Sequence, residues 1–181
     1  MVKTLISLLR AINLAGHKQV AMPVLRDFFT GLGFSDVRTL LQTGNIIFRS
    51  EAQNANDLER LLESEAKAQL GLDTDFFVRT AKDWKALVDA NPFPDEAKSD
   101  PSHLVVMFLK DAPQAKSLQA LRASIRGPEI VDLVGRQAYI VYPAGIGRSR
   151  LTNALVESKL GFRGTGRNWN TVRKIASLAE V

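Results

Sequence analysis

Hydrophobic residues in the first part of the chain form short apolar runs separated by stretches of helical periodicity. An almost continuous apolar run over residues 3–12 ends in a polar turn, as expected of a strand buried on both faces. Two further strands, over residues 37–41 and 46–48, flank the turn at residues 42–45 and predict a hairpin. A fourth short run at residues 76–78 predicts another strand.

Helical periodicity fills the gaps between these runs. A helix is expected to begin at Met22, with proline in its first turn, and to end at two glycines. A second helix is expected over residues 54–71, with leucines on one face and Glu59 and Glu63 on the other. The order strand–helix–strand–strand–helix–strand predicts a ferredoxin-like half over residues 1–80.

The same order of elements recurs at an offset of roughly 90–100 residues. A helix followed by a polar, proline-containing linker, together covering residues 81–101, separates the two copies. The second copy has expected strands at 103–109, 129–134 and 137–142 and expected helices at 113–125, 148–160 and 168–179. The sequence therefore predicts an α+β fold of two related ferredoxin-like halves with antiparallel sheets. The second half covers residues 102–181, ends in a helix and shows no recognisable closing strand.

The charge of the 181-residue chain is distributed unevenly. Residues 1–109 carry 12 basic and 14 acidic side chains, whereas residues 110–181 carry 12 basic and 5 acidic ones, a net charge of +7. Such a segment attracts anions, although arginines and lysines also simply solvate helix surfaces. We therefore expect an anionic ligand or a nucleic acid as the partner.

Cysteine is absent, which excludes disulfides, thiolate nucleophiles, iron–sulfur clusters and cysteine-based zinc sites. The two histidines, His17 and His103, have no carboxylate at metal-ligand spacing, so neither a metal nor a cofactor is expected. No apolar run approaches the ~20 residues of a membrane span, and the N-terminal run is too short for a signal peptide. These observations predict a cytoplasmic protein without a membrane partner. They leave the oligomeric state open.

The loop after the first strand concentrates polar donors. Arg10, Asn13, His17 and Lys18 lie in it together with a glycine, a composition typical of ligand loops at strand ends. The spacing matches neither a Walker loop nor a dinucleotide-binding glycine pattern, and a solvated turn would use the same residues. We predict that Arg10, Asn13 and Lys18 bind an anion. His17 is the candidate acid or base.

A second group of donors lies near the C-terminus, where glycines alternate with polar residues before the expected last helix. Thr165, Arg167 and Asn168 stand at the helix start, which offers free N–H groups to an anion. Asn168 also suits the N-cap position, which is its structural alternative. The predicted anion site combines Arg10, Asn13, Lys18, Thr165, Arg167 and Asn168.

A further candidate surface consists of Gln42 and Asn45 in the hairpin turn and Asn170 and Arg173 in the last helix. Glycine and asparagine are also the residues expected of a hairpin turn, so a purely structural role stays open for the first pair. Trp169 belongs to the apolar face of the last helix and is expected to be buried.

Several separated motifs resemble one bacterial family. They include Leu8-Leu9-Arg10-Ala11-Ile12-Asn13, Gln42-Thr43-Gly44-Asn45, Asn91-Pro92-Phe93 and Thr165-Gly166-Arg167-Asn168-Trp169-Asn170-Thr171-Val172. Together they look like the family called domain of unknown function 1697. The resemblance covers essentially the whole chain and implies an α+β fold of two related halves, a cytoplasmic location and no established activity. The family pattern has glycine where this chain has Ala11, which argues against any role that needs glycine there.

Three functions are consistent with the sequence. The leading hypothesis is a cytoplasmic binding protein for a phosphorylated or otherwise anionic partner, with nucleic acid contacted through its backbone as the main example. The second is an enzyme that acts on a small phosphorylated or carboxylated metabolite with His17 as acid or base. The third is an oligomerising interaction protein. Whether the protein is an enzyme stays open at this point.

Overall fold

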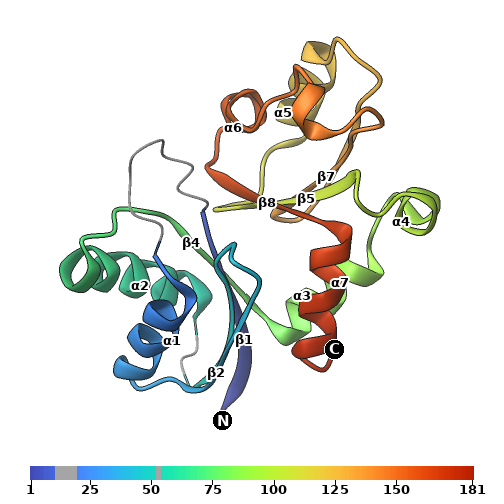
Figure 1. Ribbon diagram of the computed structural model, residues 1–181. Coiled ribbons are helices and arrows are strands. Elements are labelled where there is room, and N and C mark those ends of the chain that lie inside the picture. Colours follow the sequence, from blue (N-terminus) through green and yellow to red (C-terminus); the bar gives the residue numbers. More distant parts are fainter. Residues whose placement is uncertain (11–19, 52–53) are drawn as a thin grey trace. The chain divides into compact units, whose positions relative to one another are not determined.

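The computed structural model describes residues 1–10, 20–51 and 54–181 (Figure 1). The chain divides into two compact units, Met1–Lys85 with Ile175–Val181, and Ala86–Lys174. The divisions fall inside two helices, α3 (Ala81–Asp89) and α7 (Trp169–Leu178). Each unit is built around its own antiparallel sheet.

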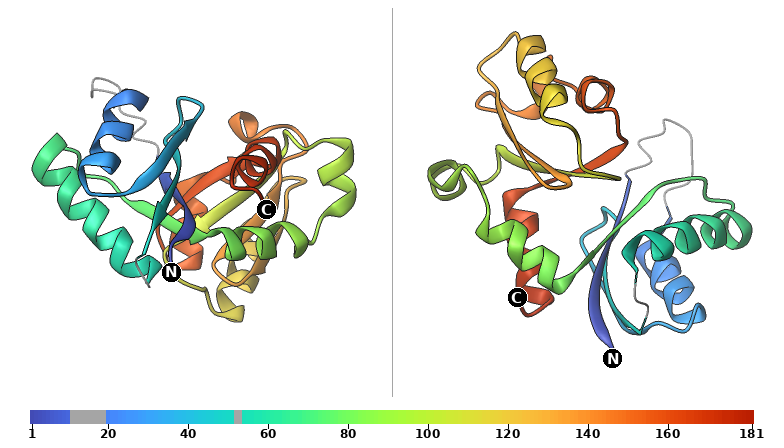
Figure 2. Two further views of the ribbon diagram at one scale, coloured as in Figure 1. Left: turned by 90° about the horizontal axis from the view of Figure 1, so that it is seen from below. Right: turned by 180° about the vertical axis from the view of Figure 1, so that it is seen from behind.

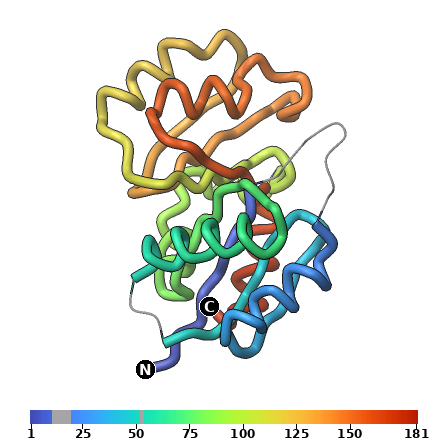
Figure 3. The backbone as a smooth tube through the Cα atoms, turned by 90° about the vertical axis from the view of Figure 1, so that its left-hand side faces the viewer, coloured from blue at the N-terminus to red at the C-terminus, as the bar shows by residue number. Residues whose placement is uncertain are grey.

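The first unit contains the sheet β2-β3-β1-β4. Its strands are β1 (Lys3–Leu9), β2 (Ser35–Leu40), β3 (Asn45–Ser50) and β4 (Phe76–Thr80). The helices α1 (Met22–Gly31) and α2 (Ala55–Leu70) cover one face of this sheet (Figures 1 and 3). This strand order and the strand–helix–strand–strand–helix–strand sequence make the unit ferredoxin-like, as predicted.

The core of the first unit lies between the sheet and these two helices. Phe29 of α1 packs edge-on against Phe48 of β3, with ring centroids 5.1 Å apart, and also contacts Phe76 of β4. Leu58 and Leu62 of α2 belong to the same buried cluster. Alternate side chains of the strands meet the apolar stripes of both helices, which is what fixes the register of the sheet.

The second unit repeats this arrangement with the sheet β6-β7-β5-β8. Its strands are β5 (Leu104–Leu109), β6 (Ile130–Val134), β7 (Gln137–Val141) and β8 (Gly164–Asn168). Its helices are α4 (Pro94–Ser99), α5 (Ala115–Ser124) and α6 (Asn153–Leu160), with a short 3-10 helix at Ile146–Arg148. Helices α5 and α6 pack on one face of the sheet around Leu121, Val156 and Leu160 (Figure 2).

Equivalent hydrogen bonds in the two units show that the halves are related. The N–H of Leu9, at the end of β1, donates to the carbonyl of Gly44 at 2.8 Å. The N–H of Leu109, at the end of β5, donates to the carbonyl of Arg136 at 2.9 Å. The duplication predicted from the order of elements therefore extends to the backbone register.

The structure corrects several expectations. A closing strand does exist in the second half, because β8 pairs with β5 along its whole length. The helix expected over 148–160 is a 3-10 turn followed by α6, which begins after the N-cap Thr152. Glu59, expected on the solvent face of α2, is buried and accepts the N–H of Val78 at 2.8 Å. In the described part of the chain, no helix is long and apolar enough to cross a membrane.

Candidate functional site

The segment predicted as an anion-binding helix start is mostly a β-strand. Thr165 and Arg167 belong to β8, and both side chains are buried. The Arg167 guanidinium donates to the Thr165 hydroxyl and to the Gly166 carbonyl, each at 2.8 Å. Burial lowers the pKa of Arg167 to about 10, so the side chain is still charged at neutral pH.

The glycines of this segment have a packing role. A Cβ atom at Gly164 would lie 2.8 Å from the Met107 Cε atom, and one at Gly166 would lie 3.2 Å from a Val105 methyl group. Both neighbours belong to β5 and to the core of the second unit. The alternation of glycine with polar residues thus arises from a strand whose inner face has no room for side chains.

The residues that follow β8 have clear local roles. Asn168 is the N-cap of α7, because its side-chain oxygen accepts the Thr171 N–H at 3.0 Å. Trp169 is 5 % exposed, which confirms that it is buried. Asn170 and Arg173 are exposed on α7, so they remain available to a partner.

The first loop is described only at its start. Arg10 forms an ion pair with Asp75 at 3.4 Å, with 32 % of its side chain exposed. Asn13, His17 and Lys18 lie outside the described residues. The shared anion site between this loop and β8 therefore stays a prediction, as does the acid–base role of His17.

The first hairpin turn separates its two candidate residues. Gln42 is exposed, whereas Asn45 is buried and its side-chain amide donates to the Leu40 carbonyl and the Thr43 hydroxyl at 2.9 Å each. Asn45 therefore holds the turn. Gly44 has a φ of 71°, and a Cβ there would lie 2.5 Å from the Leu9 Cβ, so this turn requires glycine.

Exposed cations without an ion pair gather in the second unit. Eight such residues have no carboxylate within 4 Å among the residues described, namely Lys98, Lys116, Arg126, Arg148, Arg150, Lys159, Arg173 and Lys174. The described part of the first unit has two, Lys3 and Lys82, because its other cations mostly face carboxylates. The second unit carries 13 basic and 8 acidic residues, whereas the first is balanced at 11 of each.

Two basic loops of the second unit meet. The Ser149 hydroxyl donates to the Glu129 carboxylate, which joins the loop after β7 to the loop before β6. Arg148 and Arg150 flank Ser149 in sequence, and Arg126 lies three residues before Glu129. The sequence patterns did not single out these three arginines. Their place in glycine- and proline-containing loops next to strand ends was the signal that could have found them.

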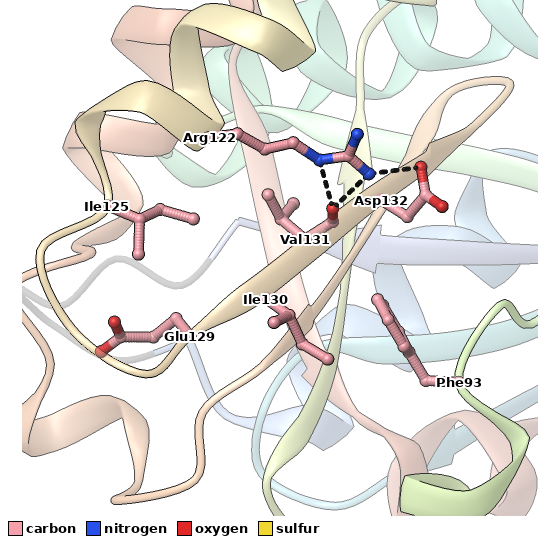
Figure 4. Close-up of a pocket in the computed structure, with 7 residues that line it drawn as sticks. All are labelled: Phe93, Arg122, Ile125, Glu129, Ile130, Val131 and Asp132. Atoms are coloured by element: carbon pink, nitrogen blue, oxygen red, sulfur yellow. Dashed lines mark hydrogen bonds and ion pairs between the residues drawn. The ribbon is translucent and has the colours of Figure 1, made fainter.

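A hollow of about 410 Å³ opens beside β6 (Figure 4). It is lined by Phe93, Arg122, Ile125, Glu129, Ile130, Val131 and Asp132. Arg122 donates to the Val131 carbonyl through two nitrogens, at 3.1 and 2.9 Å, and pairs with Asp132 at 3.2 Å. Within the residues that the structure describes, no group of three or more histidine or carboxylate side chains is placed to hold a metal ion.

Comparisons with known proteins agree with this fold. The family model described as "Protein of unknown function (DUF1697)" matches residues 2–139. No curated protein matches the chain. Among solved structures, the conserved bacterial protein SP0830 from Streptococcus pneumoniae is similar, with a TM-score of 0.76, 21% sequence identity and 99% of each chain covered. At that identity the similarity supports the fold alone.

Proposed function

The chain belongs to the DUF1697 family, a family of unknown function, and we propose that it is a cytoplasmic binding protein for an anionic, phosphate-bearing partner. The backbone of a nucleic acid is the leading example. The observation that carries the proposal is the set of eight exposed cations in the second unit that have no ion-pair partner among the described residues. The absence of cysteine fits a reducing compartment.

Unpaired cations favour an anionic partner for an electrostatic reason. A lysine or arginine that already faces a carboxylate must lose that pair before it contacts a phosphate, whereas an unpaired one only releases solvent and counterions. Arginine also matches phosphate geometry with two parallel hydrogen bonds. Arg126, Arg148 and Arg150, on the two loops joined by the Ser149–Glu129 bond, are therefore the strongest candidates for phosphate contacts.

The test measures binding of fluorescein-labelled single- and double-stranded oligonucleotides to the full chain by anisotropy, at salt concentrations from low to physiological. Affinity is expected to fall steeply with salt and to depend little on base sequence, because backbone contacts carry no sequence information. In the variant Arg148→Gln/Arg150→Gln, the plot of log affinity against log salt should become shallower, with the magnitude of its negative slope smaller by about 2.

The matched control is Lys3→Gln/Lys82→Gln, which removes the two cations of the first unit that have no ion pair among the described residues. This control should bind as the wild type does. An equal loss in both double variants would contradict the assignment to the second unit. If no oligonucleotide binds even at low salt but a small phosphorylated metabolite raises the melting temperature, the nucleic-acid example is wrong and the enzyme hypothesis gains support. A ligand at 100 times its dissociation constant stabilises by ~2.7 kcal/mol.

A further inference from the structure

The outer edge of β6 presents backbone groups to solvent. The N–H of Tyr142 donates to the His103 carbonyl, and Leu109 donates to Arg136, so Ile140 and Ala138 between them direct their backbone groups toward β5. Their partners across the β6–β7 pair are Val131 and Leu133. The N–H and C=O groups of Val131 and Leu133 therefore point away from the sheet.

Two exposed side chains form hydrogen bonds with some of these outward-facing backbone groups. Arg122 donates to the Val131 carbonyl, and the Asp132 carboxylate accepts the Leu133 N–H at 2.9 Å. Arg122 and Asp132 pair with each other at 3.2 Å, with 52 % and 41 % of their side chains exposed. An ion pair this exposed contributes at most about 1 kcal/mol, so a competing strand can displace it.

The other three sheet edges are covered or interrupted, wholly or in part. At β4, Glu59 and Glu63 of α2 accept the outward N–H groups of Val78 and Phe76. At β8, Glu157 of α6 accepts the Gly164 N–H. These carboxylates come from helices that cover the strands.

The edge at β2 is irregular. The register of β2 against β3 shifts between Ser35 and Arg38, and Asp36 has a φ of 50°. Such a bulge prevents regular pairing with a further strand. β6 instead keeps five consecutive pairs in register with β7. Among the four described edges, β6 alone combines a regular register with an exposed ion pair, Arg122–Asp132, that a further strand can displace. This ion pair is called the latch below.

The hollow of about 410 Å³ lies next to this edge, because residues of β6 form part of its lining. Ile125 and Arg122 line it from the side of α5, and Phe93 lines it from the start of α4 (Figure 4). Ile130, at the N-terminal end of β6, is 44% exposed and reaches into the same space. Backbone groups and an apolar wall thus lie where a fifth strand would lie.

We propose that the β6 edge docks an extended, acidic peptide segment of a partner protein, which pairs with Val131 and Leu133 and places an apolar side chain against Ile130 and Phe93. The peptide displaces the Arg122–Asp132 latch and adds a strand to the sheet. Its acidic character follows from charge complementarity. Arg126, Arg148 and Arg150, which have no ion pair among the described residues, lie on the loops at the N-terminal end of β6. The peptide would share these three arginines with a nucleic acid, but its pairing with the β6 backbone does not depend on nucleic-acid binding.

The experiment uses the full chain and a fluorescein-labelled nine-residue peptide in which valine alternates with glutamate. A second peptide carries proline in place of the central valine, which keeps the charge and removes a ladder N–H. We expect saturable binding of the first peptide, measured by anisotropy, and at least about tenfold weaker binding of the second. Equal binding of the two peptides, or no binding of the first, would overturn the proposal, since charge attraction alone does not distinguish them.

Matched variants localise the site. Ile130→Asn should weaken binding of the valine–glutamate peptide by about tenfold, whereas Val24→Asn, at a residue of α1 with the same exposure of 44%, should leave it unchanged. Arg122→Ala/Asp132→Ala should strengthen peptide binding by about two- to fivefold, because the latch no longer competes. If this double variant instead dimerises, as measured by light scattering, and gains no peptide affinity, the edge pairs with a second copy and the peptide proposal is wrong.

Discussion

The two halves share one topology but fill it differently at their last strand. In the first half, Phe76 and Val78 of β4 enter the core beneath α1 and α2. In the second half, Gly164 and Gly166 take the equivalent positions opposite β5, and Met107 and Leu109 occupy the space. The order of strands is therefore compatible with either a large or an absent side chain at one position, provided the neighbouring strand compensates.

Charge distinguishes the halves as clearly as packing does. Most cations in the described part of the first half face carboxylates, for example Arg60 with Asp57 and Lys67 with Asp73. Cations of the second half are mostly exposed and without such partners among the residues described. The difference indicates that the first half uses its charges for local structure and the second half presents them to solvent.

The largest expected effect tests whether the two halves depend equally on the tryptophans of α3 and α7. Trp84 and Trp169 are both buried, and replacing either by alanine should lower the free energy of unfolding by about 3–5 kcal/mol. Urea unfolding followed by far-UV circular dichroism measures this change. Asn170→Ala is the exposed control. A Trp169→Ala protein that melts within a degree or two of the wild type would contradict the importance of this burial.

The next effect compares the two hairpin turns. Gly44 and Gly135 both have positive φ, of 71° and 58°. A Cβ at Gly44 would collide with the Leu9 Cβ, whereas the nearest atom at Gly135 is 3.6 Å away. Gly44→Ala should therefore cost roughly 2–4 kcal/mol and Gly135→Ala about 1 kcal/mol, as measured by urea unfolding. Equal costs would mean that strain in φ alone governs both turns.

Sequence patterns predicted most of this architecture because apolar runs and turn residues are local signals. They missed β8, since Gly164-Thr165-Gly166-Arg167-Asn168 has none of the branched or aromatic residues typical of strands. They placed Glu59 in solvent, because its partners Val78 and Arg79 are about twenty positions away and became neighbours only on folding. Tertiary pairing, which no local window contains, explains both errors.

The candidate site was predictable to a smaller extent. The N-cap role of Asn168 followed from its position before an apolar periodic segment, and the structure confirms it. The exposed loop arginines, such as Arg148 and Arg150, were not singled out, because the glycine- and proline-containing composition of their loops is the same in a binding loop and in a solvated turn. The contact between Ser149 and Glu129 that joins their loop to that of Arg126 is a tertiary feature.

Alkaline pH should distinguish the halves, because both tyrosines of the chain lie in the second one. Burial raises the pKa of Tyr139, and burial with the nearby charge of Glu129 raises the pKa of Tyr142. Unfolded tyrosines ionise near pH 10, so the unfolded state loses protons first and stability falls as pH rises beyond about 10. Tyr139→Phe should reduce this fall and cost about 1–3 kcal/mol at neutral pH, because the Leu87 carbonyl loses its 2.6 Å hydrogen bond. Urea midpoints of the wild type and of Tyr139→Phe, measured from pH 7 to 11, test these two expectations. If the variant loses stability with rising pH as steeply as the wild type, Tyr139 does not cause the fall.

The smallest expected effect concerns the stability contributed by the charges themselves. Arg60→Gln removes an exposed ion pair in the first half and should cost a few tenths of a kcal/mol. Arg148→Gln/Arg150→Gln removes cations that have no partner among the described residues and that belong to a unit with an excess of positive charge, so it should be neutral or stabilise slightly at low salt. Both differences should shrink in high salt, where the Debye length is about 3 Å at 1 M. Melting temperatures measured at low and high salt compare the two variants directly. A clear loss of stability in the double variant at low salt would mean that these arginines support the fold of the second half. The contrast between ion-paired cations in the first half and solvent-exposed cations in the second would then be wrong.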